Sequence, residues 1–446
     1  MDTATTNSVN RVTSRGLIIS APASGCGKTT LTLALLRLLT SQNLNVASFK
    51  VGPDYIDPAF HAAATGGTSH NVDPWGMRSE TCATALTAAA RGADLVIGEG
   101  MMGLFDGADG EEGSTAELAA ILGLPVVLIV DAGAQAASAG ALIRGFRDYR
   151  ANVKVAGVIF NRVGGEAHAK TLREACMPLN VPVLGMMPWD ERLTLPERHL
   201  GLIQAGEIDE LGSFLEVASD IVERHVNVEA LLRSASAIDT AASNCGSSVS
   251  PLGQRIAVAQ DAAFAFVYEH VVDGWRGAGS EILPFSPLAE EGVPKGADSI
   301  YLPGGYPELH AGTISGNPTF LNGLREAAER RLPVYGECGG YIVLGEALID
   351  ADGLCHSMAG LLPVVTSFAA PVMHIGYRAL TVATDSVLGL SGTVFRGHEF
   401  HVCRTVTEDK SAPLFAARDI RGEEETFLGC VRGSVMGSFA HLIDRA

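Results

Sequence analysis

Short apolar runs rich in β-branched residues alternate along this chain with longer stretches rich in Ala and Leu. Runs of the first kind are typical of buried strands, and stretches of the second kind are typical of helices. Strands that alternate with helices predict βα units around a mostly parallel sheet, and therefore an α/β fold. The predicted strands are residues 17–20, 46–50, 95–98, 126–130, 155–160 and 183–186 in a first series, and 255–259, 281–284, 299–302 and 333–335 in a second.

A change in composition near residue 250 separates the two series. The first series stops near Leu232, and residues 233–253 are rich in Ser and Ala with few large apolar side chains, which indicates a linker. At 446 residues the chain is long enough for more than one domain with a full core. We predict one domain over residues 16–232 and a second over residues 254–446.

The composition excludes several classes of function. The formal net charge is −18, and no basic stripe is available to neutralise a nucleic-acid backbone. The eight cysteines include no CxxC pair, which disfavours a zinc site or a disulfide framework and fits a reducing cytoplasm. Residues 1–15 resemble a polar tail and not a signal peptide, and no apolar run is long enough to span a bilayer. We expect a cytoplasmic protein without nucleic-acid or membrane partners; a homodimer is compatible with these features.

A glycine-rich turn, SGCGKTT at residues 24–30, follows the first predicted strand and precedes a predicted helix. Glycines let successive backbone N–H groups point at phosphate oxygens, and a helix start adds its positive dipole. Lys28 would reach the β- and γ-phosphates of a nucleotide, and the Thr29 hydroxyl would bind Mg²⁺. Pro22 replaces the usual opening glycine, but the strand–turn–helix context is complete, so we predict a P-loop for ATP. Its phosphate contacts are predicted to come from Gly25, Gly27, Lys28, Thr29 and Thr30.

Acidic residues lie in the turns after the second and third predicted strands. Ligands of an open α/β sheet gather at the carboxyl ends of the strands. We therefore predict that Asp54, Glu99 and Asp106 meet near the γ-phosphate as oxygen ligands for Mg²⁺. The alternative for each is an acid exposed on a loop. Asp57 is interpreted as a turn-former beside Pro58.

A second glycine-framed turn, GECGG at residues 336–340, follows the predicted strand 333–335. A thiol between such glycines resembles a nucleophile on a strand-to-helix elbow. The helix N-terminus would favour the thiolate of Cys338, and nearby backbone N–H groups would form an oxyanion hole. We predict Gly339 and Gly305 as the two donors, and we interpret the other seven cysteines as structural.

A nucleophilic thiol needs a base. The predicted candidates are His374, His398, His401 and His441. They lie in Gly- and His-rich segments, around 374–401 and 431–441, that resemble strands joined by tight turns, and sequence order alone does not choose between them. His398 and His401, three residues apart without a third ligand, are a weak metal pattern.

Several longer motifs resemble those of the cobyrinic acid a,c-diamide synthases, from about residue 16 to the end. The matching segments are APASGCGKTT (21–30), KVGPDYIDP (50–58), MGLFDG (102–107), LPGGYPEL (302–309), GECGGY (336–341) and RGHEFH (396–401). The resemblance implies a first domain similar to dethiobiotin synthetase and a second similar to the class I glutamine amidotransferases.

The resemblance also implies a reaction, that of a glutamine-hydrolysing carbon–nitrogen ligase. ATP would phosphorylate the a and c side-chain carboxylates of a corrin ring, and ammonia from glutamine would displace the phosphate. By position, Cys338 would form the glutamyl thioester with His441 as its base, and Asn161 would contact adenine. The residues carried over to metal, phosphate or substrate binding are Asp54, Glu99 and Asp106.

One position departs from the amidotransferase pattern. Class I enzymes usually carry Glu two residues after the histidine, but residue 443 is Ile. The resemblance therefore supports a Cys–His dyad and leaves a third member open.

The finer likeness, in YIVLGEALIDA (341–351) and APLFA (412–416), is to the aerobic-pathway enzymes that act on cobalt-free hydrogenobyrinic acid. Cobyrinic acid is the alternative substrate, and cobyric acid synthase is the alternative enzyme. A P-loop partitioning or switch ATPase is the alternative of a different class, which release of ammonia from glutamine would exclude.

Overall fold

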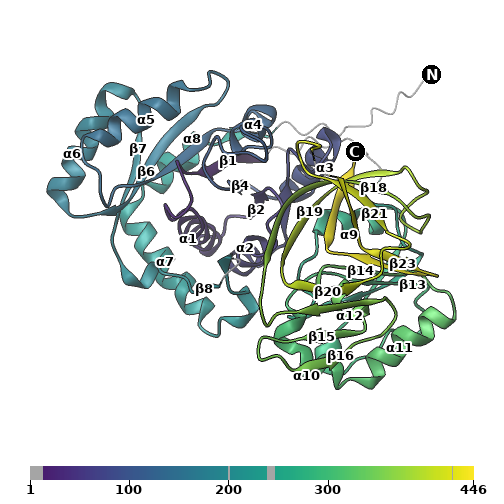
Figure 1. Ribbon diagram of the computed structural model, residues 1–446. Helices are drawn as coiled ribbons and strands as arrows, with labels where there is room; N and C mark the ends of the chain where they lie inside the picture. The colour runs from purple at the N-terminus through teal and green to yellow at the C-terminus, as the bar shows by residue number, and fades with distance from the viewer. Residues whose placement is uncertain (1–13, 199–200, 239–246, 424) are drawn as a thin grey trace, which may run out of the picture. The chain divides into compact units, whose positions relative to one another are not determined.

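The structure, a computed structural model, has the predicted α/β fold and separates into two compact units (Figure 1). The described residues are 14–198, 201–238, 247–423 and 425–446. Of these, residues 14–74 and 82–238 belong to the first unit, and residues 75–81, 247–423 and 425–446 belong to the second. No helix in these ranges has the length and apolar character needed to cross a bilayer. The predicted tail lies mostly outside the described residues, as does the middle of the predicted linker.

The first unit is built on a parallel sheet in the order β3-β2-β4-β1-β5-β6-β7. The central strands are almost continuously apolar because a parallel sheet is covered on both faces. The strands are β1 (Arg15–Ser20), β2 (Val46–Val51), β3 (Ser69–Val72), β4 (Leu95–Glu99), β5 (Val126–Asp131), β6 (Val155–Val163), β7 (Val183–Pro188) and β10 (Ser236–Ala237), with a separate pair β8 (Glu197–Arg198) and β9 (Gly201–Leu202).

Helices connect these strands. The helix α1 begins at Lys28, directly after the glycine-rich turn, and packs its leucines against the sheet and against α7 and α2. The helices are α1 (Lys28–Ser41), α2 (Asp57–Thr65), α3 (Ser79–Ala90), α4 (Thr115–Leu122), α5 (Ser138–Asp148), α6 (Glu166–Cys176), α7 (Leu211–His225) and α8 (Val228–Ser234), with 3₁₀ turns at Met177–Leu179, Glu191–Leu193 and Ala205–Glu207.

All six strands predicted in the first series are confirmed, and two further strands of the main sheet, β3 and β10, were not predicted, nor was the separate pair β8–β9. β3 carries His70 and Asn71, so it lacks an apolar signal; Asn71 is buried because its amide donates to the carbonyls of Gly52 and Asp54, at 2.9 and 2.7 Å. β10 lies inside the segment that we expected to be a linker, and it pairs antiparallel with the start of β1. The sheet thus includes residues beyond the point where the apolar pattern stops.

The described part of the second unit contains three sheets. The first, β12-β11-β13-β14-β24-β23, is parallel except for β23, and it contains all four strands predicted in the second series. Its strands are β11 (Arg255–Ala259), β12 (Glu281–Phe285), β13 (Ser299–Leu302), β14 (Val334–Glu337), β23 (Cys430–Arg432) and β24 (Val435–Ser438).

The Gly- and His-rich segments form strands, as predicted. The segment around 374–401 and the end of the segment 431–441 lie in an antiparallel sheet of order β22-β21-β18-β19-β25, whereas the rest of 431–441 forms β23 and β24 of the first sheet. The strands of the antiparallel sheet are β18 (Met373–Val382), β19 (Val394–Val402), β21 (Phe415–Arg418), β22 (Glu425–Leu428) and β25 (Ala440–Arg445). The third sheet comprises β15 (Ala347–Ile349), β16 (Cys355–Ser357), β17 (Val364–Ser367) and β20 (Arg404–Glu408). The helices of the unit are α9 (Glu269–Gly277), α10 (Ala311–Ser315), α11 (Pro318–Glu329) and α12 (Gly339–Leu344), with 3₁₀ turns at Pro287–Ala289 and Pro307–His310.

Residues 75–81 come from the first half of the sequence but belong to the second unit. The Arg78 guanidinium donates to both carboxylate oxygens of Asp444, at 3.1 and 2.9 Å, and the Arg78 backbone N–H donates to the same group at 2.9 Å. The Asp444 side chain is fully buried. The Arg396 guanidinium donates to the Trp75 carbonyl and lies 5.0 Å from the centroid of its ring. The second unit is therefore assembled from two separate stretches of the chain.

Candidate active site

The glycine-rich turn after β1 has the backbone conformation that the phosphate prediction requires. Gly25 and Gly27 have φ angles of +79° and +93°, in the left-handed region that favours glycine. A Cβ at Gly27 would also overlap the side-chain amide of Asn161, which donates to the Cys26 carbonyl at 3.0 Å. Asn161, from β6, therefore packs directly against the turn and holds it in place.

Lys28 extends back over this turn. Its ammonium group donates to the carbonyls of Met102 and Ala23, at 2.6 and 3.2 Å. Burial lowers the pKa of Lys28, as does the charge of Lys50 nearby, whereas the Glu99 carboxylate raises it. A cation in this position is well placed to meet a phosphate.

A cavity of about 580 Å³ lies at the carboxyl ends of β1, β2, β4 and β6. It brings together most of the predicted site residues: Gly25, Gly27, Lys28, Thr29, Thr30, Asp54, Glu99 and Asn161. Asp106 is not among the residues that line it. Its side chain is exposed and accepts the backbone N–H of Gly103 at 3.0 Å, so Asp106 shapes the loop after β4 instead.

Glu99 is the centre of a buried polar network beneath this cavity. Its two carboxylate oxygens contact the Thr29 hydroxyl at 2.6 Å, the Lys50 ammonium at 2.9 Å and Nε2 of His61 at 2.8 Å. Burial alone would raise the pKa of Glu99, but Lys50 and His61 hold it well below its usual value. Glu99 is therefore an anion that holds the Thr29 side chain from beneath.

Lys50 and Asp57 are site residues whose roles the sequence did not predict. Asp57 begins α2, but it is not only a turn-former, because its buried carboxylate pairs with the Lys50 ammonium. Burial would lower the pKa of Lys50, yet the carboxylates of Asp57 and Glu99 raise it well above its usual value. The signal that could have revealed the pair is a lysine in the interior of a strand otherwise buried in the sheet.

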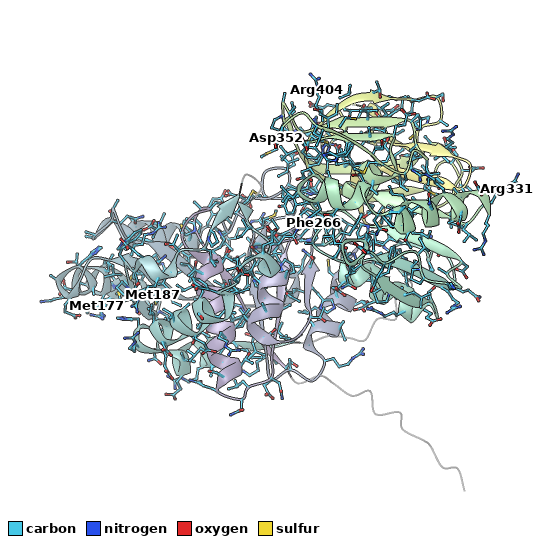
Figure 2. All side chains as sticks on the ribbon, turned by 90° about the horizontal axis from the view of Figure 1, so that it is seen from below. Met177, Met187, Phe266, Arg331, Asp352 and Arg404 are labelled. Carbon is cyan, nitrogen blue, oxygen red and sulfur yellow. The ribbon has the colours of Figure 1, made fainter. Side chains whose placement is uncertain are left out.

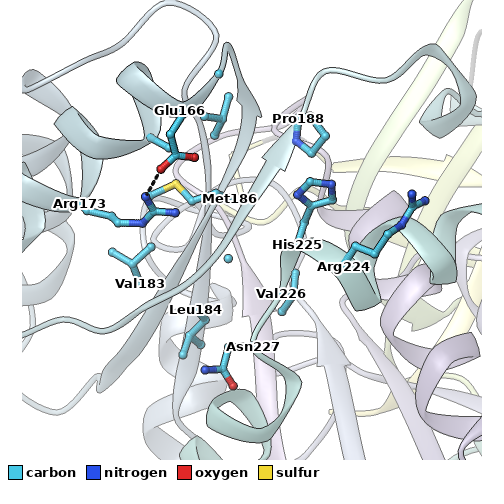
Figure 3. Close-up of a pocket in the computed structure, with 14 residues that line it drawn as sticks. Glu166, Arg173, Val183, Leu184, Met186, Pro188, Arg224, His225, Val226 and Asn227 are labelled. Carbon is cyan, nitrogen blue, oxygen red and sulfur yellow. Dashed lines mark hydrogen bonds and ion pairs between the residues drawn. The ribbon is translucent and has the colours of Figure 1, made fainter.

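A second cavity, of about 510 Å³, lies along β7 in the same unit (Figure 3). In Figure 3 the Arg173 guanidinium is directed at the Glu166 carboxylate, and the two groups are 3.2 Å apart. None of the predicted site residues lines this cavity.

The turn after β14 has the geometry of a nucleophile elbow. Cys338 has φ +46° and ψ −104°, a strained conformation for a residue with a side chain, and α12 starts at the next residue. A Cβ at Gly336 would lie 2.7 Å from the carbonyl carbon of Gly340, and a Cβ at Gly340 would overlap the Leu302 carbonyl. The flanking glycines are therefore required by the close approach of the backbone.

The Cys338 thiol is buried. Its Sγ donates to the Phe400 carbonyl at 3.6 Å. Burial raises the pKa of Cys338 well above its usual value, and the charge of Glu308 adds to this effect. The backbone N–H groups of Gly339 and Gly305 both point at the sulfur and lower the pKa, but by less. The expected shift toward thiolate is therefore not found, because burial raises the pKa by more than these two N–H groups lower it.

His441 is the candidate base that lies beside the thiol. A Cβ placed on Gly304 would be 3.0 Å from Nε2 of His441 and 3.2 Å from Cβ of Cys338, so the imidazole and the thiol border the same small space. The ring of Phe266, labelled in Figure 2, packs against the imidazole with centroids 6.5 Å apart.

The other three histidines make different contacts. His398 lies opposite His441 in the β19–β25 pairing. Nδ1 of His401 is 3.2 Å from Sγ of Cys403, and exposed His374 stacks on the His401 ring. Of the four candidates, His441 has the geometry of a base for Cys338.

Comparison with known proteins identifies both units. Residues 17–203 match the family model of the CobQ/CobB/MinD/ParA nucleotide binding domain, and residues 255–445 match that of the CobB/CobQ-like glutamine amidotransferase domain. The chain is thus a glutamine amidotransferase joined to a nucleotide-binding domain.

Relatives that match nearly the whole chain identify the protein family within this class. Hydrogenobyrinate a,c-diamide synthase of Brucella anthropi is 51% identical over 434 residues, covering 96% of this chain and 98% of its own. The Sinorhizobium protein of the same name is 49% identical over 97% and 99% of the two chains, and that of Mesorhizobium japonicum is 45% identical over 98% and 100%. The chain belongs to the hydrogenobyrinate a,c-diamide synthase family, which confirms the resemblance seen in its motifs. A solved structure of PurLQS from Thermotoga maritima covers 42% of this chain and 86% of its own at 17% identity, with a TM-score of 0.32, too low to bear on the fold.

Proposed function

We propose that this chain converts the a and c side-chain carboxylates of hydrogenobyrinic acid to amides, using ATP and glutamine. The observation that carries the proposal is a sequence identity of about 50% to hydrogenobyrinate a,c-diamide synthases over nearly the whole of both chains. The two geometries described above support it, because one suits phosphate binding and the other suits a thiol nucleophile.

In the first unit, the γ-phosphate of ATP would lie against the turn of residues 24–30, with Lys28 beside it. A carboxylate oxygen of the corrin attacks the γ-phosphorus, the bond to ADP breaks, and an acyl phosphate forms. Ammonia then attacks the acyl carbon, phosphate leaves, and the nitrogen loses a proton. The positive charge of Lys28 and the N–H groups of the turn stabilise the charge on the transferring phosphoryl group.

The residues around Thr29 fit a Mg²⁺ ion. The hydroxyl of Thr29 and the carboxylates of Asp54 and Glu99 line one cavity, and such oxygens are the ligands that Mg²⁺ prefers. Mg²⁺ held there would neutralise phosphate charge. One oxygen of Asp54 already accepts the backbone N–H groups of Ile56 and Asp57, at 2.8 and 3.0 Å, so its side chain is fixed in direction.

In the second unit, Cys338 would attack the side-chain amide carbon of glutamine. His441 takes the thiol proton and passes it to the departing ammonia, and water then hydrolyses the thioester to glutamate. The N–H groups of Gly305 and Gly339 are the donors for the negative oxygen of the tetrahedral intermediate, which their direction toward the sulfur supports.

We expect Asp54→Asn to raise the Mg²⁺ concentration needed for half-maximal amidation by at least roughly tenfold. Asparagine keeps the acceptor for Ile56 and Asp57 but loses the charge that attracts the ion. Asp106→Asn should leave this Mg²⁺ dependence unchanged, because Asp106 is exposed and does not line the cavity. Initial rates over a Mg²⁺ titration measure both variants; equal shifts in the two would contradict the assignment.

The proposed function is tested by mass spectrometry of the products formed with ATP, Mg²⁺ and glutamine. Two successive amidations of hydrogenobyrinic acid are expected, faster than any amidation of cobyrinic acid in a parallel reaction. Faster turnover of cobyrinic acid would move the assignment to the cobalt-containing substrate. Consumption of ATP with neither corrin altered would refute the proposal.

A further inference from the structure

The residue before the nucleophile, Glu337, has a buried carboxylate with an unusual set of partners. Its side chain is only 4% exposed, although it lies next to the site of reaction. The hydroxyls of Tyr301 and Tyr335 donate to it at 2.6 and 2.8 Å, and the backbone N–H of Leu442 donates at 3.0 Å. Burial raises the pKa of both tyrosines, and the negative charge of Glu337 raises it further. Both phenols are therefore neutral donors that hold the carboxylate in one orientation.

This carboxylate lies close to one ring nitrogen of the His441 imidazole. Oε2 of Glu337 is 3.6 Å from Nδ1 of His441, and both side chains are almost completely buried. The other ring nitrogen, Nε2, borders the space beside Gly304 that Cβ of Cys338 also borders. Glu337 thus lies near Nδ1, and Nε2 lies near the space that Cβ of Cys338 also borders. Catalytic hydrogen bonds are often this long before substrate binds and tighten in the reacting complex.

We propose that Glu337 is the third member of the amidotransferase site, a positioning residue that acts on Cys338 through His441. It orients the ring with Nδ1–H toward its carboxylate, which leaves Nε2 to take the thiol proton, and it stabilises the imidazolium that forms. This inference rests on the proposed function of the second unit. It also accounts for Ile443, because the carboxylate comes from the residue before the nucleophile and not from the second residue after the histidine.

The backbone explains why this position can take the role. Glu337 is the last residue of β14, and its backbone pairs with Ser438 of β24, three residues before His441. The reversal of direction at Cys338 separates the thiol from the Glu337 side chain, although the two residues are adjacent in sequence. Glu337 also accepts the backbone N–H of Leu442, which is the residue directly after His441. One carboxylate thus fixes both the ring of His441 and the backbone that carries it.

The test compares Glu337→Gln with the unaltered chain in two reactions, amidation with glutamine and amidation with added ammonia. Glutamine keeps the shape and one of the two acceptor oxygens, puts an amide donor at the other, and removes the charge. We expect kcat with glutamine to fall roughly 100- to 1000-fold, while the KM for glutamine changes by less than about threefold. The ammonia reaction should keep at least roughly half of its rate, because it does not use the thiol.

A matched control is Glu408→Gln. Glu408 is also a largely buried carboxylate of the second unit that accepts a tyrosine hydroxyl, that of Tyr341, at 2.7 Å. It should change kcat with glutamine by less than about threefold. Glu337→Asp restores the charge on a shorter side chain, and its kcat should fall by less than roughly tenfold.

Three results would overturn the role of Glu337. One is normal glutamine turnover in Glu337→Gln, and another is an equal loss with glutamine and with ammonia. The third is a loss of kcat with glutamine that is as large in Glu337→Asp as in Glu337→Gln. This comparison decides the matter if the Gln variant folds poorly. The proposed function is judged separately, since it fails if the unaltered chain releases no ammonia from glutamine, whatever the Glu337 variants do.

Discussion

Replacing Lys28 with alanine should abolish amide formation with glutamine and with ammonia alike. The Lys28 ammonium is buried at the floor of the 580 Å³ cavity, where two backbone carbonyls orient it. Among the described residues, the only other lysine that lines the cavity is Lys50, which is already paired with Asp57 and Glu99. We therefore expect a loss of at least roughly 1000-fold, about 4 kcal/mol of transition-state stabilisation.

Mass spectrometry of the corrin product and release of ADP measure this loss. Lys170→Ala is the matched control, because Lys170 is an exposed lysine of the same unit whose ion pair with Glu174 is 3.9 Å long. It should retain full activity. Glutamine hydrolysis by the second unit should persist in Lys28→Ala, which would show that the protein is folded. Retained corrin amidation in Lys28→Ala would refute the phosphate role of the turn.

Cys338→Ser should lose amidation with glutamine but keep amidation with ammonia. A hydroxyl fits the elbow but is a far weaker nucleophile than a thiol toward an amide carbon, so we expect a loss of at least roughly 1000-fold with glutamine. The raised pKa of Cys338 strengthens this expectation, because a thiol that is protonated at neutral pH depends on its base. Ammonia enters after the thiol has acted and should support at least roughly half of the unaltered rate.

The two nitrogen sources are compared in parallel with Cys430→Ser as the control. Cys430 is a buried thiol of the same unit, 3.5 Å from the Tyr341 hydroxyl, and it has no contact with a histidine among the described residues. This variant should keep glutamine turnover within about threefold. Equal loss with both nitrogen sources in Cys338→Ser would contradict the role assigned to the thiol.

The parts of the sites that could be predicted are those formed by residues that are close together in the sequence. The turns at 24–30 and 336–340 depend on glycines within a few positions of Lys28 and Cys338, so a single short segment contains the whole signal. The strands around them follow from apolar runs. Asp54 and Glu99 could also be predicted as site residues, because each lies at or shortly after the carboxyl end of a parallel strand.

The parts that could not be predicted depend on contacts between distant segments. His61 and Glu99, or Glu337 and His441, meet only after the sheets form, and no periodicity encodes their distance. Asp106 lies in the loop after the strand that ends with Glu99, yet its side chain accepts the Gly103 N–H and does not line the cavity. The preference of Cys338 for the neutral thiol also depends on burial, which a motif does not reveal.

The membership of residues 75–81 in the second unit has a consequence for how the gene can be divided. A cut anywhere between residues 238 and 247 would separate Arg78 from Asp444, leaving a fully buried carboxylate without its guanidinium. An uncompensated buried charge is strongly destabilising. The amidotransferase half expressed alone would therefore need residues 75–81 supplied, for example as a fused peptide. In a chimera of two relatives joined at the linker, residues 75–81 would come from one protein and the rest of the second unit from the other. Such a chimera should fold only where the two proteins agree in this short segment. The second unit therefore cannot be obtained by a single cut in the linker.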